Sequence, residues 1–120
     1  VKINLDSSFL WYTRRVEDSM IEVKATFPKR DNTGIPFRSS MFRHVEGILL
    51  DMVGGYTVTE CSGGWVDDLM KEYTDHSYVY SVVVDDMNKA TKVMSDLKWI
   101  LLNEFGQKCA WITYSDINIF

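Results

Sequence analysis

The feature of this sequence that most restricts its fold is the order in which two kinds of hydrophobic periodicity follow one another. Strand-like alternation occupies residues 20–27, 56–61, 77–84 and 109–114, and helix-like spacing occupies residues 39–53 and 88–105. Alternation with a period of two gives a strand one apolar face, whereas spacing at i, i+3, i+4 and i+7 gives a helix one apolar stripe. The predicted order of elements is therefore β-α-β-β-α-β.

The predicted strands differ in how clearly they are marked. In the first, apolar residues from Ile21 to Phe27 alternate with Glu22, Lys24 and Thr26, and Pro28 ends the run. Residues 77–84 are rich in β-branched and aromatic side chains, which predicts a central strand. The last strand is expected at Cys109 to Tyr114.

Each predicted helix has a start signal, an apolar face and a glycine stop. Ser39 or Ser40 is expected to cap the first helix, and Gly54-Gly55 to end it. Asp85-Asp86 precedes the second helix, and Gly106 follows it. The two apolar faces are Met41, Phe42, Val45, Ile48, Leu49, Met52 and Val53, and Ala90, Val93, Met94, Leu97, Ile100, Leu101 and Phe105.

The length and composition fit one domain over residues 1–120, since 46% of the 120 residues are hydrophobic and can form a core. The element order predicts an α+β, ferredoxin-like βαββαβ sandwich, with both helices on one face of a four-stranded antiparallel sheet. The other face of the sheet is mixed polar and aromatic, so we expect it to be buried against identical subunits.

Charge and motif content exclude several classes of function. A net charge of −4 and a pI near 5.1 argue against nucleic acid as the main partner. The sequence has no apolar run near 18 residues and no export signal, so we expect no membrane span and a cytoplasmic location. Cys61 and Cys109 are then expected as thiols rather than a disulfide. The two histidines are far apart and match no metal motif, so neither a metal nor a cofactor is predicted.

Two other segments are expected to serve the structure rather than to bind a ligand. Val1 to Ser19 includes Phe9-Leu10-Trp11-Tyr12, which is too apolar for a free tail, and is expected to pack on the core or on a neighbouring subunit. Lys29 to Arg38 is a polar loop with glycine and proline, and is expected to be a surface connection rather than a lid over a ligand.

The stretch from Gly55 to Ser77 is the candidate functional segment. Between its strand-like ends we expect an ordered connection of about fifteen residues, much longer than the 2–5 residues usual between neighbouring strands. It holds five acids, Glu60, Asp67, Asp68, Glu72 and Asp75. If residues 66–73 turn helically, Asp68 and Glu72 share a face and can hold a cation or ligand hydroxyls between them. The alternative is a solvated acidic loop.

Trp65 and Glu104 are two further candidates. Trp65 follows Gly63-Gly64 and can stack on a base or face a cation, although a glycine pair is often only a turn. Glu104 continues the spacing of the inward stripe at a helix end whose dipole disfavours an acid by about 0.3–1 kcal/mol. It either belongs to a site or reaches solvent or Lys108 from the edge of the stripe. No nucleophile is recognisable, which favours chemistry by positioning and electrostatics.

The C-terminal run N-E-F-G-Q-K-C-A-W-I-T-Y, residues 103–114, resembles the end of the phage-encoded S-adenosylmethionine-degrading enzymes. These SAMases were long called hydrolases and are now regarded as lyases. More loosely, the G-x-Y around Tyr56 and the cluster of Gly64, Trp65 and Asp68 also resemble that family. The resemblance covers about residues 54–114.

The resemblance implies a homotrimer of GlnB-like (PII-like) sandwiches with active sites at subunit interfaces. The implied reaction splits S-adenosylmethionine into 5′-methylthioadenosine and homoserine lactone, which defeats host restriction by removing the methyl donor. The implied catalytic acids are Glu104 and Asp68, and the expected substrate-binding residues are Tyr56, Thr57, Trp65 and Glu72. The alternatives are a non-catalytic GlnB-like module that binds adenine nucleotides, and a structural interaction domain.

Overall fold

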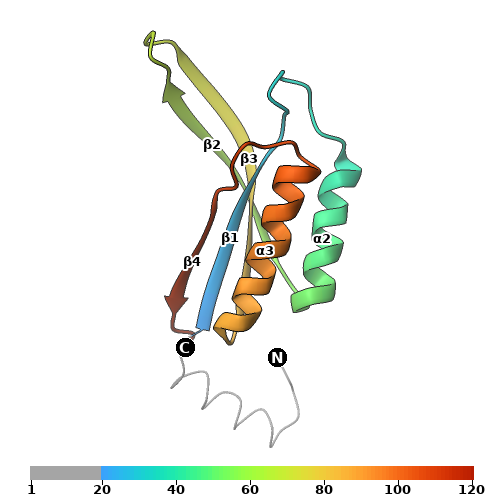
Figure 1. Cartoon of the computed structure of the whole chain (residues 1–120). Coiled ribbons are helices and arrows are strands. Elements are labelled where there is room, and N and C mark those ends of the chain that lie inside the picture. Colours follow the sequence, from blue (N-terminus) through green and yellow to red (C-terminus); the bar gives the residue numbers. More distant parts are fainter. Residues whose placement is uncertain (1–19) are drawn as a thin grey trace, which may run out of the picture.

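The computed structural model describes residues 20–120, so the predicted packing of residues 1–19 lies outside the described residues. The elements follow the predicted order: β1 Met20–Pro28, α2 Ser39–Val53, β2 Thr57–Val66, β3 Glu72–Val84, α3 Met87–Asn103 and β4 Ile112–Ile117. The strands form one antiparallel sheet in the order β2-β3-β1-β4 (Figure 1). The βαββαβ ferredoxin-like fold is confirmed, with β3 inside the sheet as predicted.

Both helices cover the same face of the sheet, and the core lies between these two layers (Figure 1). Phe27 of β1 is fully buried, with its ring edge-on to Tyr80 at 5.5 Å and to Phe105 at 5.0 Å between centroids. The predicted apolar faces supply the helical side of the core: Phe42, Val45 and Leu49 from α2, and Ala90, Val93, Leu97, Ile100 and Leu101 from α3. The core therefore follows directly from the periodicity of the sequence.

The predicted cap of the first helix is wrong. Ser39 and Ser40 are already the first residues of α2, and the capping position is Arg38, which makes no side-chain capping bond among the described residues. The Asp85-Asp86 pair does mark the start of α3. Asp86 is its N-cap, and the Asp86 carboxylate accepts a 2.8 Å hydrogen bond from the Lys89 backbone N–H. Gly54 caps α2 as predicted, with φ of 85° in the left-handed region that suits glycine. Helix α3 ends at Asn103, two residues earlier than predicted, and Gly106 follows with φ of 62°.

The long connection predicted between the second and third strands is also wrong. Strand β2 continues to Val66 and β3 begins at Glu72, so the loop is only residues 67–71. The pairing is unbroken from Thr57 opposite Ser81 to Val66 opposite Glu72. Residues 66 and 72–73 are strand, which removes the helical turn expected there. The acidic stretch is a β-hairpin that projects beyond the body of the domain (Figure 1).

The last strand begins later than predicted, at Ile112 rather than Cys109, and continues to Ile117. The reason is its pairing: β4 lies at the edge of the sheet against β1, from Ala25 opposite Ile112 to Met20 opposite Ile117. Neither helix within residues 20–120 combines the length and the hydropathy needed to span a bilayer.

The face of the sheet away from the helices is mixed, as predicted. It presents Glu22, Lys24 and Thr26 from β1 beside Ser81 of β3, whose hydroxyl donates to Glu22 at 2.9 Å. Trp111, just before β4, is 72% exposed. Burial of this face against identical subunits stays a prediction.

Candidate functional site

The tip of the hairpin is organised by Asp67. One oxygen of its carboxylate accepts from the backbone N–H groups of Leu69 and Lys71, both at 2.9 Å, and the other accepts from the Tyr73 hydroxyl at 3.0 Å. These bonds, the one from Lys71 foremost, hold the pKa of Asp67 below its ordinary value. The loop is therefore ordered, and Asp67, which the sequence did not single out as a site residue, is its structural centre.

The stem of the hairpin carries an aromatic pair. Trp65 of β2 stacks on Tyr73 of β3 with centroids 4.3 Å apart and planes 13° apart, and its indole N–H donates to Asp75 at 2.9 Å. The Trp65 side chain is still half exposed, at 51%. Gly63 and Gly64 are paired residues of β2 rather than a turn. Trp65 is thus held in a fixed orientation, with surface left for a planar ligand.

A cavity of about 620 Å³ lies beside this stem. It is bounded by Trp65, Tyr73 and Asp75 of the hairpin, by the loop at Asp31 and Asn32, and by Gln107 after α3. Small-molecule sites have volumes of about 300–1,000 Å³, so the space suits a nucleoside-sized ligand. The loop at residues 29–38 is therefore a surface connection that also forms a wall of this cavity.

Glu104 lies at the C-cap of α3, and the structure corrects its predicted orientation. It does not join the buried stripe, because the helix ends at Asn103 and Phe105 takes the inward position. The Glu104 carboxylate lies 3.5 Å from the imidazole of His44 on α2 rather than near Lys108, and its side chain is 34% exposed. Neither of the interpretations from spacing gave His44 as the neighbour.

Glu104 borders a groove of about 360 Å³ between α2 and α3. Two more carboxylates, Asp51 and Asp96, line this groove together with Trp99, which is 58% exposed. The floor is apolar, from Ile48, Met52 and Ile100. Three carboxylates beside an indole suit an organic cation. Ile100 belongs to the apolar face that was predicted for α3. Asp96 and Trp99 precede Glu104 on the same helix beside that face, so following the neighbouring stripe would have found them.

Tyr56 and Thr57 lie at the start of β2, away from the hairpin tip. Tyr56 is half buried, with its ring 5.9 Å from Tyr80, and burial, helped by the nearby Glu46, raises the pKa of its hydroxyl. Glu46 itself accepts a 2.7 Å hydrogen bond from the Tyr80 hydroxyl, and burial, then this bond, raises the pKa of Tyr80 well above its ordinary value. Thr57 is exposed and lies opposite Ser81.

The predicted acids do not form one cluster within a single chain. Asp68 is exposed at the hairpin tip and Glu72 begins β3, paired with Val66. Glu104 lies at the end of α3, in a separate groove that neither acid lines. An arrangement that brings Asp68, Trp65 and Glu104 to one ligand therefore requires a second copy of the chain.

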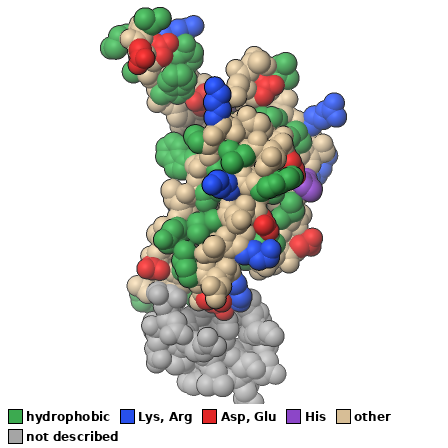
Figure 2. Space-filling model, in the orientation of Figure 1, with side chains coloured by type: hydrophobic (Ala, Val, Ile, Leu, Met, Phe, Trp, Pro, Cys, Tyr) green, Lys and Arg blue, Asp and Glu red, His purple; other side chains and the backbone are tan. Residues whose placement is uncertain are grey.

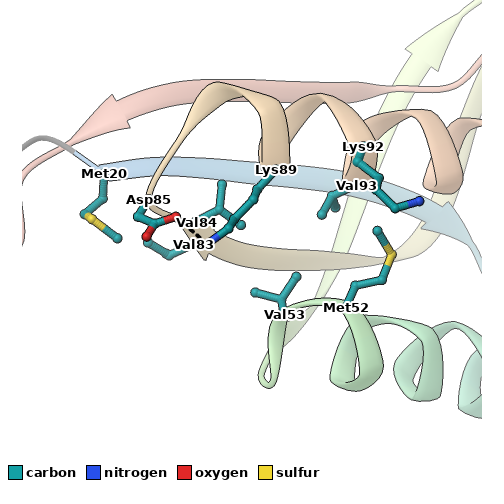
Figure 3. Close-up of a pocket in the computed structure, with 9 residues that line it drawn as sticks. All are labelled: Met20, Met52, Val53, Val83, Val84, Asp85, Lys89, Lys92 and Val93. Atoms are coloured by element: carbon teal, nitrogen blue, oxygen red, sulfur yellow. Dashed lines mark hydrogen bonds and ion pairs between the residues drawn. The ribbon is translucent and has the colours of Figure 1, made fainter. Parts of the chain in front are cut away.

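Two further cavities contain none of the predicted site residues. One, of about 290 Å³, lies where β1 begins and is lined by Met20, Met52 and Val93 with Lys92 and the Asp85–Lys89 ion pair at its edge (Figure 3). The other, of about 380 Å³, lies at the base of the hairpin and is lined by Lys29, Arg30, Pro36, Phe37, Ser39, Phe42, His76 and Tyr78.

The cysteines and acids of residues 20–120 show neither a disulfide nor a metal site. Cys61 and Cys109 are exposed free thiols. Among these residues no group of three or more His, Cys, Asp or Glu side chains is arranged to hold a metal ion.

Comparison with solved structures supports the fold, whereas comparison of sequences finds no related protein. No family model matches the chain, and no curated protein sequence matches it significantly. Solved structures do match. The apo form of a phage SAM lyase aligns with a TM-score of 0.63 and 11% identity over 84% of this chain and 83% of that one. Its complex with S-methyl-5′-thioadenosine aligns at 0.61 and 8% over 85% and 92%.

Two other solved proteins have the same fold. The ATP complex of GlnK from B. subtilis aligns with a TM-score of 0.55 and 13% identity over 82% of both chains. The divalent cation tolerance protein CutA from Archaeoglobus fulgidus aligns at 0.58 and 10% over 84% of this chain and 86% of that one. At such identities the likeness establishes a GlnB-like fold, and function has to be argued from the site.

Proposed function

We propose that the protein is an S-adenosylmethionine lyase that produces 5′-methylthioadenosine and L-homoserine lactone. The observation that carries this proposal is the groove at Glu104, where the carboxylates of Asp51 and Asp96 and the indole of Trp99 line an apolar floor. S-adenosylmethionine is a sulfonium cation with an ammonium group. A groove of carboxylates and an indole favours that charge.

The proposed reaction needs no nucleophile from the protein. An oxygen of the substrate carboxylate forms a bond to the substrate's γ-carbon, the bond from that carbon to sulfur breaks, and the electron pair stays on sulfur as a neutral thioether. Opposite charges disappear as the ring closes, so a site drier than water lowers the barrier. A folded substrate chain also gives an orientation advantage.

The proposed site lies between subunits of a homotrimer. Trp65 would stack on the adenine, since Tyr73 and Asp75 already fix the indole. Glu104 of a neighbouring subunit would hold the ammonium group near the reacting carbon, and Glu72 the ribose hydroxyls. Asp68, at the tip of the same hairpin, would position the hairpin on that subunit. Tyr56 and Thr57, at the opposite end of β2 from Trp65, would contact the substrate from the subunit that supplies Glu104. The exposed Trp111 and the uncovered sheet face are the surfaces that the trimer would bury.

A non-catalytic module that binds adenine nucleotides is the second candidate, and one observation favours it. Lys29, Arg30 and His76 line the 380 Å³ cavity at the base of the hairpin, where the phosphates of a nucleotide could bind. The acidic hairpin tip beyond this cavity disfavours a triphosphate, which is why the lyase is preferred.

Thermal unfolding with two ligands distinguishes these candidates. A lyase is expected to be stabilised by S-adenosylmethionine, by about 2.7 kcal/mol at a hundred times its dissociation constant, and little by ATP. Each scan starts immediately after mixing, so that little S-adenosylmethionine is consumed before unfolding is recorded. Stabilisation by ATP alone would favour the nucleotide-binding module, and no shift with either ligand would favour an interaction domain.

A further inference from the structure

The hairpin tip exposes two large apolar side chains on an ordered loop. Leu69 is 88% exposed and Met70 is 78% exposed. Figure 2 shows hydrophobic and acidic side chains together at this projecting end of the molecule. Neighbouring apolar side chains held so far from the core lose the benefit of burial unless another surface covers them.

The backbone beneath these side chains is strained as well as ordered. Met70 has φ of 65°, the single positive φ among the described residues other than glycine. Such a conformation costs about 1 kcal/mol or more for a side chain like methionine and persists where surrounding contacts enforce it. Here Asp67 enforces it, since its backbone carbonyl accepts from Met70 N–H at 3.0 Å while its carboxylate holds Leu69 and Lys71. The loop presents Leu69 and Met70 in one arrangement.

The cavity at the base of the hairpin, here called the hairpin-base cavity, is apolar and positively charged, which complements the apolar and acidic hairpin tip. Its apolar surfaces come from Pro36, Phe37 and Phe42, and its cations are Lys29 and Arg30. Lys29 already contacts Glu60 at 3.3 Å and the Tyr78 ring at 4.6 Å. Arg30 donates to the Gly34 carbonyl at 3.0 Å, and a guanidinium has five donors, so it can also bind a carboxylate. The tip offers Asp68 next to Leu69.

We propose that the hairpin tip of one chain docks into the hairpin-base cavity of a second copy, with Leu69 and Met70 on its apolar surfaces and Asp68 paired with Arg30. A chain cannot fill its own cavity in this way. His76 and Tyr78 line the cavity, and the paired strands run straight from there to the tip. Because tip and cavity are different surfaces, the contact is heterologous and can close a ring of subunits.

Helix α2 connects this inference to the groove at Glu104 without making it depend on the lyase activity. Phe42 lines the hairpin-base cavity and Ile48 lines the groove, about 9 Å apart along one helix. One neighbouring hairpin could therefore reach both. Assembly is measured without substrate, so a failure of the docking and a failure of the activity are separate results.

Photo-crosslinking of the full chain tests the docking directly. A benzophenone amino acid replaces Leu69, the labelled protein is mixed with isotopically heavy wild-type chain, and crosslinked peptides are mapped by mass spectrometry. The expected result is light-to-heavy crosslinks to residues 29–42 and 76–78. Crosslinks confined to other regions, or none between chains, would overturn the proposal.

Two sets of variants test the energetics by analytical ultracentrifugation. Leu69→Asp should raise the dissociation constant of self-association about tenfold or more, whereas Leu50→Asp, at a half-exposed leucine of α2, should not. Asp68→Arg and Arg30→Asp should each weaken association, and the double variant should restore it. Unchanged association in Leu69→Asp, or no restoration in the double variant, would contradict the proposed contact.

Discussion

Replacing Glu104 by glutamine is expected to lower the turnover of S-adenosylmethionine about 10²-fold, because the weaker contact to the substrate's ammonium group misplaces the carbon at which the ring closes. The change keeps the size of the side chain and removes its charge from the groove that also holds Asp51 and Asp96. Initial rates of methylthioadenosine release measure the effect.

The same substitution should leave the fold intact. The contact to His44 at 3.5 Å lies at the surface, where even a full ion pair contributes only about 0–1 kcal/mol. Removing a negative charge from the end of α3 also relieves an unfavourable interaction with the helix dipole. Asp116→Asn, a similar change on β4, is the matched control and should retain wild-type turnover. Wild-type turnover in Glu104→Gln, with the fold preserved, would remove Glu104 from the site.

Replacing Phe27 by alanine is expected to cause a large loss in the free energy of unfolding. The side chain is fully buried between α3 and the sheet and contacts the rings of Tyr80 and Phe105. Removing a ring from such a position costs about 3–5 kcal/mol, a large part of the 5–15 kcal/mol that typically stabilises a domain. Urea unfolding followed by circular dichroism measures the change.

Phe120→Ala is the control for this experiment, because Phe120 is 88% exposed and its replacement should change the free energy of unfolding by less than about 0.5 kcal/mol. All proteins should be compared at one concentration, since self-association also stabilises the folded chain. A loss below about 1 kcal/mol for Phe27→Ala would show that Phe27 is not central to the core.

The fold could be predicted because the apolar residues that form its core recur at regular spacing along the chain. The alternation from Ile21 to Phe27 predicts four residues that the structure buries, and the stripes of α2 and α3 predict the buried helical residues. Five other stripe residues are only partly buried against the core: Met41, Ile48, Met52, Val53 and Met94. The hairpin could not be predicted in this way. Gly63 and Gly64 have low strand propensity, and the pairing depends on the Trp65–Tyr73 stack and the bonds of Asp67, which no periodicity reveals.

The sequence led to single residues of the candidate site but not to their arrangement. Spacing led to Glu104, yet it placed the side chain inward because it extended the helical period past the last residue of α3. The loop acids led to Asp68, whereas the bonds are made by its neighbour Asp67. Asp51 and Asp96 belong to different helices, so only the packing of α2 against α3 brings them to Glu104.

The most direct test of the central claim is the identity of the products formed from S-adenosylmethionine by the purified full chain. Chromatography with mass detection should show 5′-methylthioadenosine and homoserine lactone appearing together, with homoserine only later as the lactone opens. Homoserine ahead of any lactone would indicate attack by water instead. S-adenosylmethionine recovered unchanged would contradict the proposed activity.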